Sequence, residues 1–153
     1  MSVDPGLLST LRNLARTLGI AELSETDAAH VTRSAQDAFV TKPEATWWWT
    51  VLRPPVASLR YGEKDGLTLL LRLVPSETTV VLVVTDDEHT PWPAFEGSLR
   101  EVVTMLREAR VFEFWIVTRD WRWIVFDTHN NELVVSGSLV TLAQAIVAPP
   151  LDG

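Results

Sequence analysis

The sequence predicts an α+β fold, a largely antiparallel sheet of five or six strands with helices against it. N-terminal helices should precede the sheet, one helix should precede a C-terminal three-stranded meander, and another should follow it. Two observations predict this. Residues 111–137 contain three aromatic and β-branched runs separated by polar segments, and capping signals elsewhere precede apolar residues at helical spacing. We expect residues 1–153 to form a single α+β domain, since this length is usual for one.

The first hairpin of the meander alternates its side chains with the period of two that is typical of a half-buried strand. With a loop over residues 118–122, Ile116 pairs with Ile124 and Phe114 pairs with Phe126. That register gathers five apolar side chains on one face of the sheet: Phe112, Phe114, Ile116, Ile124 and Phe126. A shift of one residue would move half of them into water, so we expect burial to fix this pairing.

The second hairpin should turn at Asn130-Asn131, because asparagine tolerates a positive φ. This turn places Phe126 opposite Val135. The other face of the meander then carries Trp115 and Trp123 among valines and acidic residues. One interpretation is that helices or the chain ends cover this face. The other is an exposed patch that docks a partner, since tryptophan is enriched at binding hot spots.

Helices are predicted wherever apolar residues recur at helical spacing after a capping signal. The expected helices run from Asp4-Pro5 to Gly19, from Ser24 to the stop at Lys42-Pro43, onward from the capping pair Ser98 and Glu101, and over residues 138–147. The second helix presents small side chains, which indicates close packing rather than a ligand site.

Three further strands are predicted before the meander, over residues 56–61, 67–73 and 79–85. The last is almost wholly apolar and β-branched, which suits a central strand covered on both faces. Residues 44–55 fit either a helix or a strand, and we favour a short helix or a packed irregular segment. Three consecutive tryptophans cannot all point inward from a strand, so at least one should line a rim or groove. These are Trp47, Trp48 and Trp49.

Composition narrows the function classes. The formal charge of −7 disfavours broad nucleic-acid binding, which needs a basic face. The absence of cysteine excludes disulfides, thiolate metal sites and a thiol nucleophile. No stretch approaches the roughly 20 apolar residues of a membrane span, and the N-terminus lacks the pattern of a secretory signal. We therefore expect a cytoplasmic protein that does not bind or span a membrane. No phosphate-binding glycine loop is present, and we expect no cofactor.

An acidic loop followed by histidine offers the best candidate for catalysis. The residues are Asp86, Asp87, Glu88 and His89. Carboxylates beside an imidazole can hold a divalent metal, and Asp127 with His129 could complete the site from the meander. A second option is a carboxylate pair in an aromatic cleft, for which Glu113 and Asp127 supply the residue types. The alternative for both is an ordinary acidic surface on a chain of this charge.

The meander resembles that of a group of small bacterial proteins. The resemblance is carried by FEFWIV at residues 112–117, then Trp123, Asp127, His129 and Asn130, and covers about a third of the chain. Such proteins are similar to the SUKH-type immunity superfamily, whose members are α+β domains that bind and neutralise toxin enzymes. The resemblance implies an acidic, non-catalytic protein that binds another protein.

The leading hypothesis is a non-catalytic protein-binding module, with an immunity-like role as its most specific form and a basic toxin as the partner that would complement its charge. The expected contacts are Trp115, Trp123 and one of Trp47, Trp48 and Trp49, with Asp86, Asp87 and Glu88 as a charged rim. Two alternatives stay open. One is a metal-assisted or carboxylate-based hydrolase, and the other is a domain that binds a small ligand in a tryptophan-lined groove.

Overall fold

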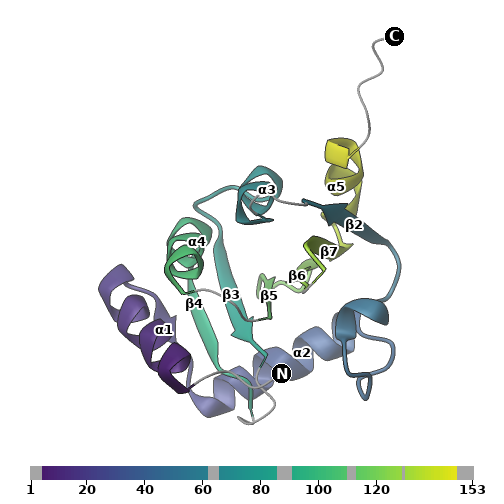
Figure 1. The fold of residues 1–153 in the computed structure, drawn as a ribbon. Coiled ribbons are helices and arrows are strands. Elements are labelled where there is room, and N and C mark those ends of the chain that lie inside the picture. The colour runs from purple at the N-terminus through teal and green to yellow at the C-terminus, as the bar shows by residue number, and fades with distance from the viewer. Residues whose placement is uncertain (1–4, 62–65, 86–90, 110–112, 129, 148–153) are drawn as a thin grey trace.

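The computed structural model describes residues 5–61, 66–85, 91–109, 113–128 and 130–147. In these residues the chain forms five α-helices and one seven-stranded antiparallel sheet (Figure 1). The strands lie in the order β1 (Ala21–Glu22), β4 (Ala94–Ser98), β3 (Thr79–Val84), β5 (Phe114–Val117), β6 (Trp123–Asp127), β7 (Glu132–Gly137) and β2 (Val56–Arg60). The predicted α+β class is confirmed, with one strand more than the expected maximum.

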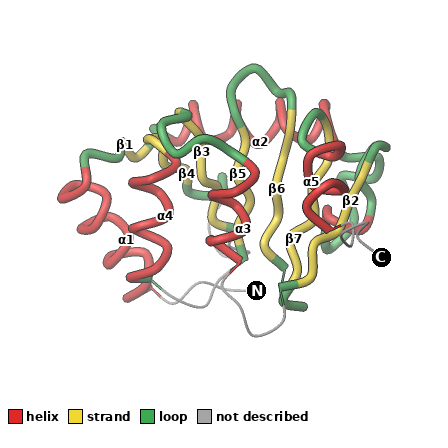
Figure 2. The backbone as a smooth tube through the Cα atoms, turned by 90° about the horizontal axis from the view of Figure 1, so that it is seen from above, coloured by secondary structure: helices red, strands yellow, loops and turns green. Residues whose placement is uncertain are grey.

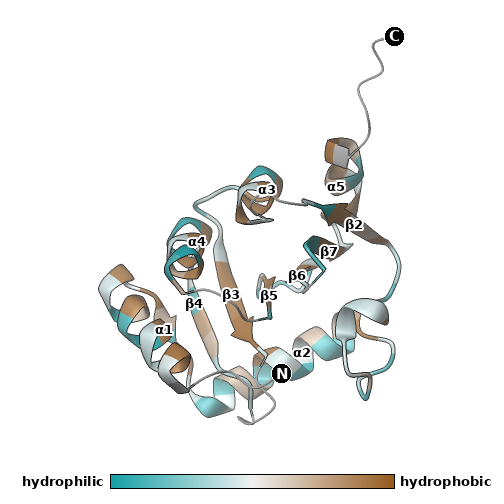
Figure 3. Cartoon of the chain, in the orientation of Figure 1, coloured by the Kyte–Doolittle hydropathy of each residue, from teal (hydrophilic) through white to brown (hydrophobic). Residues whose placement is uncertain are grey.

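Helices cover both faces of the sheet (Figures 1 and 2). One face packs against α1 (Pro5–Leu18), α3 (Gly66–Leu73), α4 (Leu99–Glu108) and α5 (Val140–Val147). The other packs against α2 (Glu25–Phe39) and a short 3-10 helix, η1 (Trp48–Thr50). Two hydrophobic cores result, and Figure 3 shows the contrast between the hydrophobic β3 and the hydrophilic stretches of α2.

The predicted helix starts are confirmed where a cap defines them. Ser24 accepts a hydrogen bond from the backbone of Asp27 and begins α2. Ser98 and Glu101 form a full capping box at the start of α4. Gly19 follows α1 with a φ of +77°, a conformation that glycine adopts without strain. In α5, Val140 and Ala143 are buried, whereas Leu142 is 44% exposed.

The segment predicted as a strand over residues 67–73 is the helix α3, so this prediction was wrong. Its leucines fit both periods, but the buried ones are Leu67, Leu70 and Leu73, three residues apart. The run contains no β-branched residue other than Thr68, and leucine favours a helix. Composition was therefore the better guide than alternation.

Two strands were not predicted. Ala94–Ser98 forms β4, which pairs with the central β3 and with the two-residue β1. Prolines before this run and Gly97 within it resemble loop residues, which explains the omission. The glycine serves close packing, since a Cβ built there would lie 3.0 Å from Cγ1 of Ile20.

The meander forms as predicted, but its register is shifted by one residue. Ile116 pairs with Val125 rather than with Ile124, and Phe126 pairs with Val134 rather than with Val135. Burial could not fix the register because helices cover both faces, so either pairing buries apolar side chains. At the second turn, Asn131 has the positive φ expected of asparagine, at 55°.

Candidate aromatic binding site

The segment between α2 and β2 lies across the α2 face of the sheet. Its base is closed by an isolated bridge between Val40 and Leu52. Within it, the backbone amide of Thr50 donates to the carbonyl of Trp47 at 3.2 Å, closing a single 3-10 turn. The indole Nε1 of Trp48 donates to the carbonyl of Pro43 at 3.1 Å, which holds this ring inward. Residues 44–55 are thus a packed irregular segment with one short helix, as expected.

Six aromatic side chains meet where this segment packs on the sheet, and three of them come from the segment itself. We call them the aromatic cluster: Trp47, Trp48, Trp49, Trp92, Trp115 and Phe126. The Trp48 ring centroid lies 5.2 Å from that of Trp92 and 6.0 Å from that of Trp115. Trp49 lies 5.8 Å from Trp47 and 6.4 Å from Phe126. Such tilted and edge-to-face pairs contribute about 0.5–1.5 kcal/mol each beyond their buried area.

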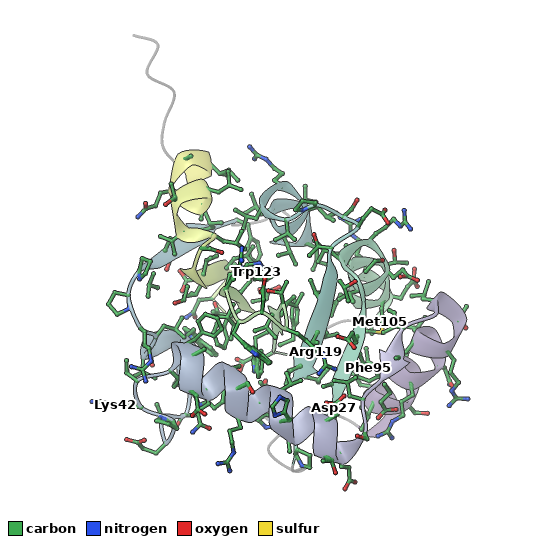
Figure 4. All side chains as sticks on the ribbon, turned by 180° about the vertical axis from the view of Figure 1, so that it is seen from behind. Asp27, Lys42, Phe95, Met105, Arg119 and Trp123 are labelled. Carbon is green, nitrogen blue, oxygen red and sulfur yellow. The ribbon has the colours of Figure 1, made fainter. Side chains whose placement is uncertain are left out.

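The cluster passes from core to surface. Trp115 is fully buried and Trp48 is 8% exposed, whereas Trp47 is 45% exposed. The interpretation that helices cover this face is confirmed for Trp115, which α2 and η1 cover, and the interpretation of an exposed patch of Trp115 and Trp123 is wrong. Trp123 is 7% exposed on the opposite face, toward α5 (Figure 4). Of the tryptophans expected as contacts, Trp47 and the half-buried Trp49 reach the surface.

Trp92 was not predicted as part of the site. It lies in a Pro-Trp-Pro sequence, which marked it only as a loop residue. The signal that could have identified Trp92 was its residue type, since a large aromatic side chain between two prolines is costly to expose in a loop. In the structure it is half-buried against Trp48. The expected acidic rim of Asp86, Asp87 and Glu88 lies outside the described residues.

A small cavity of about 50 Å³ opens beside the cluster. It is lined by Thr46, Trp47, Trp48, Trp49, Thr85, Trp92, Glu113, Phe114, Trp115 and Phe126. Glu113 is the one charged residue among these, and it is 9% exposed. Its backbone carbonyl accepts hydrogen bonds from the amide and the hydroxyl of Thr85, which fixes its strand end beside β3. We call this hollow the aromatic pocket.

A larger, open groove of about 570 Å³ runs alongside α2. Its lining comprises Ala29, Thr32, Arg33, Gln36, Pro43, Ala45, Thr46, Trp48, Pro91 and Trp92. The groove and the aromatic pocket share Thr46, Trp48 and Trp92, so the two hollows adjoin at the Trp48–Trp92 pair. We call it the α2 groove.

Each hollow is lined by a side chain whose polar atom has no hydrogen-bond partner in the described residues. These atoms are Nε1 of Trp115, beside the aromatic pocket, and Oγ1 of Thr32, beside the α2 groove. A buried donor or acceptor without a partner costs about 1–3 kcal/mol. The aromatic pocket and the α2 groove therefore each border a buried polar atom that the described residues leave without a partner.

Arg119 positions the helix that forms one wall of the groove. From the β5–β6 loop its guanidinium pairs with Asp27 of α2 at 3.1 Å and with Glu96 of β4 at 2.7 Å. Figure 4 shows Arg119 and Asp27 near each other beside α2. The hydrogen bond from Arg119 is the largest influence on Asp27 and lowers the pKa of its carboxyl.

Replacing Arg119 with methionine should return the pKa of Asp27 toward the ordinary value of about 3.9. A carboxyl whose pKa is lower in the folded state stabilises the fold above the unfolded pKa, and this contribution is lost as pH falls through the folded pKa. The variant should therefore lose less stability than wild type below pH 4. Carboxyl-carbon NMR titration measures the shift. Glu101 is the control, because Ser98 lowers its pKa independently. An unchanged Asp27 titration would contradict this.

The predicted metal site stays a prediction. Among the described residues, no group of three or more His, Cys, Asp or Glu side chains could hold a metal ion. Asp127 accepts a hydrogen bond from the hydroxyl of Tyr61 at 2.7 Å. The other proposed ligands lie outside those residues: Asp86, Asp87, His89 and His129.

In the described part of the chain, no helix has the length and apolar character needed to cross a membrane.

Comparison with protein families places the chain in a known family. A family model described as a family of unknown function, DUF6756, matches residues 12–146, from α1 to α5. No curated protein and no solved structure matches the chain significantly. The family covers both layers of helices, the whole sheet and the aromatic cluster.

Proposed function

The chain belongs to this family of unknown function, and we propose that it is a non-catalytic, cytoplasmic protein-binding module with an immunity-like role. A segment of the partner lies in the α2 groove and places one side chain in the aromatic pocket. The observation that carries this proposal is the aromatic cluster, which reaches the surface at Trp47 and lines both hollows through Trp48 and Trp92. The resemblance of the meander to small bacterial proteins that are similar to the SUKH-type immunity superfamily supports the same role.

The sizes of the hollows favour a protein partner over a small molecule. Pockets for small ligands usually measure about 300–1,000 Å³ and bury most of the ligand. The aromatic pocket, at about 50 Å³, is too small for that and fits the end of one side chain. The α2 groove is large enough but open, so it suits an extended segment that continues beyond it.

The exposed residues have the character of a contact surface. The indole of Trp47 is 45% exposed, and a partner that covers it removes apolar surface from water, which favours binding. Tryptophan is among the residues most enriched at binding hot spots, which lie where a surrounding rim excludes water. The half-buried Trp49 lies against Trp47, with the two ring centroids 5.8 Å apart. The net charge of −7 favours a basic partner through faster encounter.

Binding to proteins encoded beside this chain's gene tests the proposal. Calorimetric titration should find one that binds the wild type, and Trp47→Ala should weaken that binding by about 30-fold or more, the effect of a hot spot worth about 2 kcal/mol. Co-expression should also restore growth if that protein is toxic. The matched control is Leu142→Ala, an equally exposed apolar residue on α5. Unchanged affinity in Trp47→Ala, or no binding and no rescue by any neighbour, would contradict the proposal.

A further inference from the structure

We infer that the aromatic pocket receives an arginine side chain of the partner; this deepens the proposed function and rests on it. The pocket is lined by aromatic residues, Glu113 and two threonines, and none of the described residues that line it is basic. Aromatic faces attract cations, and guanidinium also stacks on them because it is planar and weakly hydrated. The pocket therefore offers an environment that a cation prefers to an anion.

The size of the pocket agrees with this occupant. The aromatic pocket is small, with a volume of about 50 Å³. The head of an arginine side chain has one carbon and three nitrogen atoms, so it occupies a similar space.

The hydrogen-bonding groups also suit guanidinium. It presents five N–H donors and no acceptor. The carboxylate of Glu113 can accept several hydrogen bonds, and the hydroxyls of Thr46 and Thr85 can accept further ones. Nε1 of Trp115 is itself a donor, so guanidinium does not pair with it. The inference depends on the rings and on Glu113.

The adjoining α2 groove, in contrast, disfavours a cationic side chain. Among the described residues that line the α2 groove, Arg33 is the one charged residue, and it would repel a second cation there. A partner segment that occupies both hollows should therefore carry arginine at the aromatic pocket and neutral or acidic residues along α2. The order of cationic, neutral and acidic residues along the partner segment, rather than its net basic charge alone, identifies that segment.

Titration with N-acetyl-arginine amide, followed through the indole N–H signals in ¹⁵N NMR spectra, tests the inference. The signals are assigned by single substitutions. Arginine amide should shift the signals of Trp47 and Trp49 in a saturable manner, and N-acetyl-citrulline amide, which has the same shape without the charge, should bind about tenfold more weakly. Glu113→Gln should reduce arginine binding about tenfold as well. Glu44→Gln is the control, because Glu44 is exposed on the same segment and outside the lining.

Equal binding of arginine and citrulline, no shift with either, or shifts confined to Trp121 would overturn the inference. The citrulline comparison uses the wild-type protein, so it decides even if Glu113→Gln fails to fold. The two proposals fail in different ways. If arginine does not bind but Trp47→Ala still weakens the partner complex, the protein-binding function stands and the arginine inference falls. If arginine binds but Trp47→Ala leaves the complex unchanged, the protein-binding function falls.

Discussion

Replacing Trp115 with alanine is expected to lower the free energy of unfolding by about 3–5 kcal/mol. This indole is fully buried, and its ring centroid lies 6.0 Å from that of Trp48 and 6.3 Å from that of Phe126. Removing it leaves a cavity between α2, η1 and the sheet that rigid strands cannot fill. Urea unfolding, followed by far-ultraviolet circular dichroism, measures the loss.

Trp47→Ala is the matched control for this prediction, because it removes the same side chain from the other end of the aromatic cluster. It should cost about 1 kcal/mol or less, since the indole is 45% exposed. Similar losses in the two variants would mean that Trp47 is a structural residue. The proposed binding surface would then lose its main support.

The second large effect is expected for Gly137→Ala. Gly137 ends β7 with a φ of +92°, and a Cβ built there would lie 2.2 Å from the backbone oxygen of Arg122. That oxygen accepts the amide hydrogen of Ser138 at 2.8 Å, so it cannot move away without losing a hydrogen bond. The backbone strain alone costs about 1–3 kcal/mol, and the clash should increase the loss. Thermal unfolding would show it as a lower Tm.

Gly19→Ala separates strain from clash. Gly19 has a similar φ of +77°, but a Cβ there meets its nearest neighbour, Oε2 of Glu101, at 3.6 Å. Its cost should stay near the 1–2 kcal/mol of a left-handed residue. If Gly137→Ala proves no worse than Gly19→Ala, the backbone where the end of β7 pairs with the start of β6 adapts more easily than its geometry indicates.

Prediction from sequence succeeded where one residue type has one physical role. Ser24 and Ser98 marked helix starts because their hydroxyls pair with amides that the helix leaves free. The β-branched run at residues 79–85 indicated a central strand, and β3 is buried on both faces. The strand predicted over residues 56–61 is present as β2, Val56–Arg60.

Prediction failed where a pattern had two solutions of similar free energy. The leucines of α3 satisfied both a period of two and a helical spacing. The meander register depended on one face being solvated, but α2 covers that face as well. For the same reason, sequence could not show which tryptophans are exposed. Trp47 and Trp48 are adjacent in sequence, yet a single 3-10 turn sends one outward and the other into the core.

The central claim is that the outer end of the aromatic cluster is a contact surface. The most direct measurement records the indole N–H signals of the labelled chain before and after adding a protein that binds it. We predict large changes at Trp47 and Trp49, and none at Trp123, which lies across the sheet. A complex that leaves Trp47 and Trp49 unchanged and perturbs signals on the α5 side instead would contradict the account.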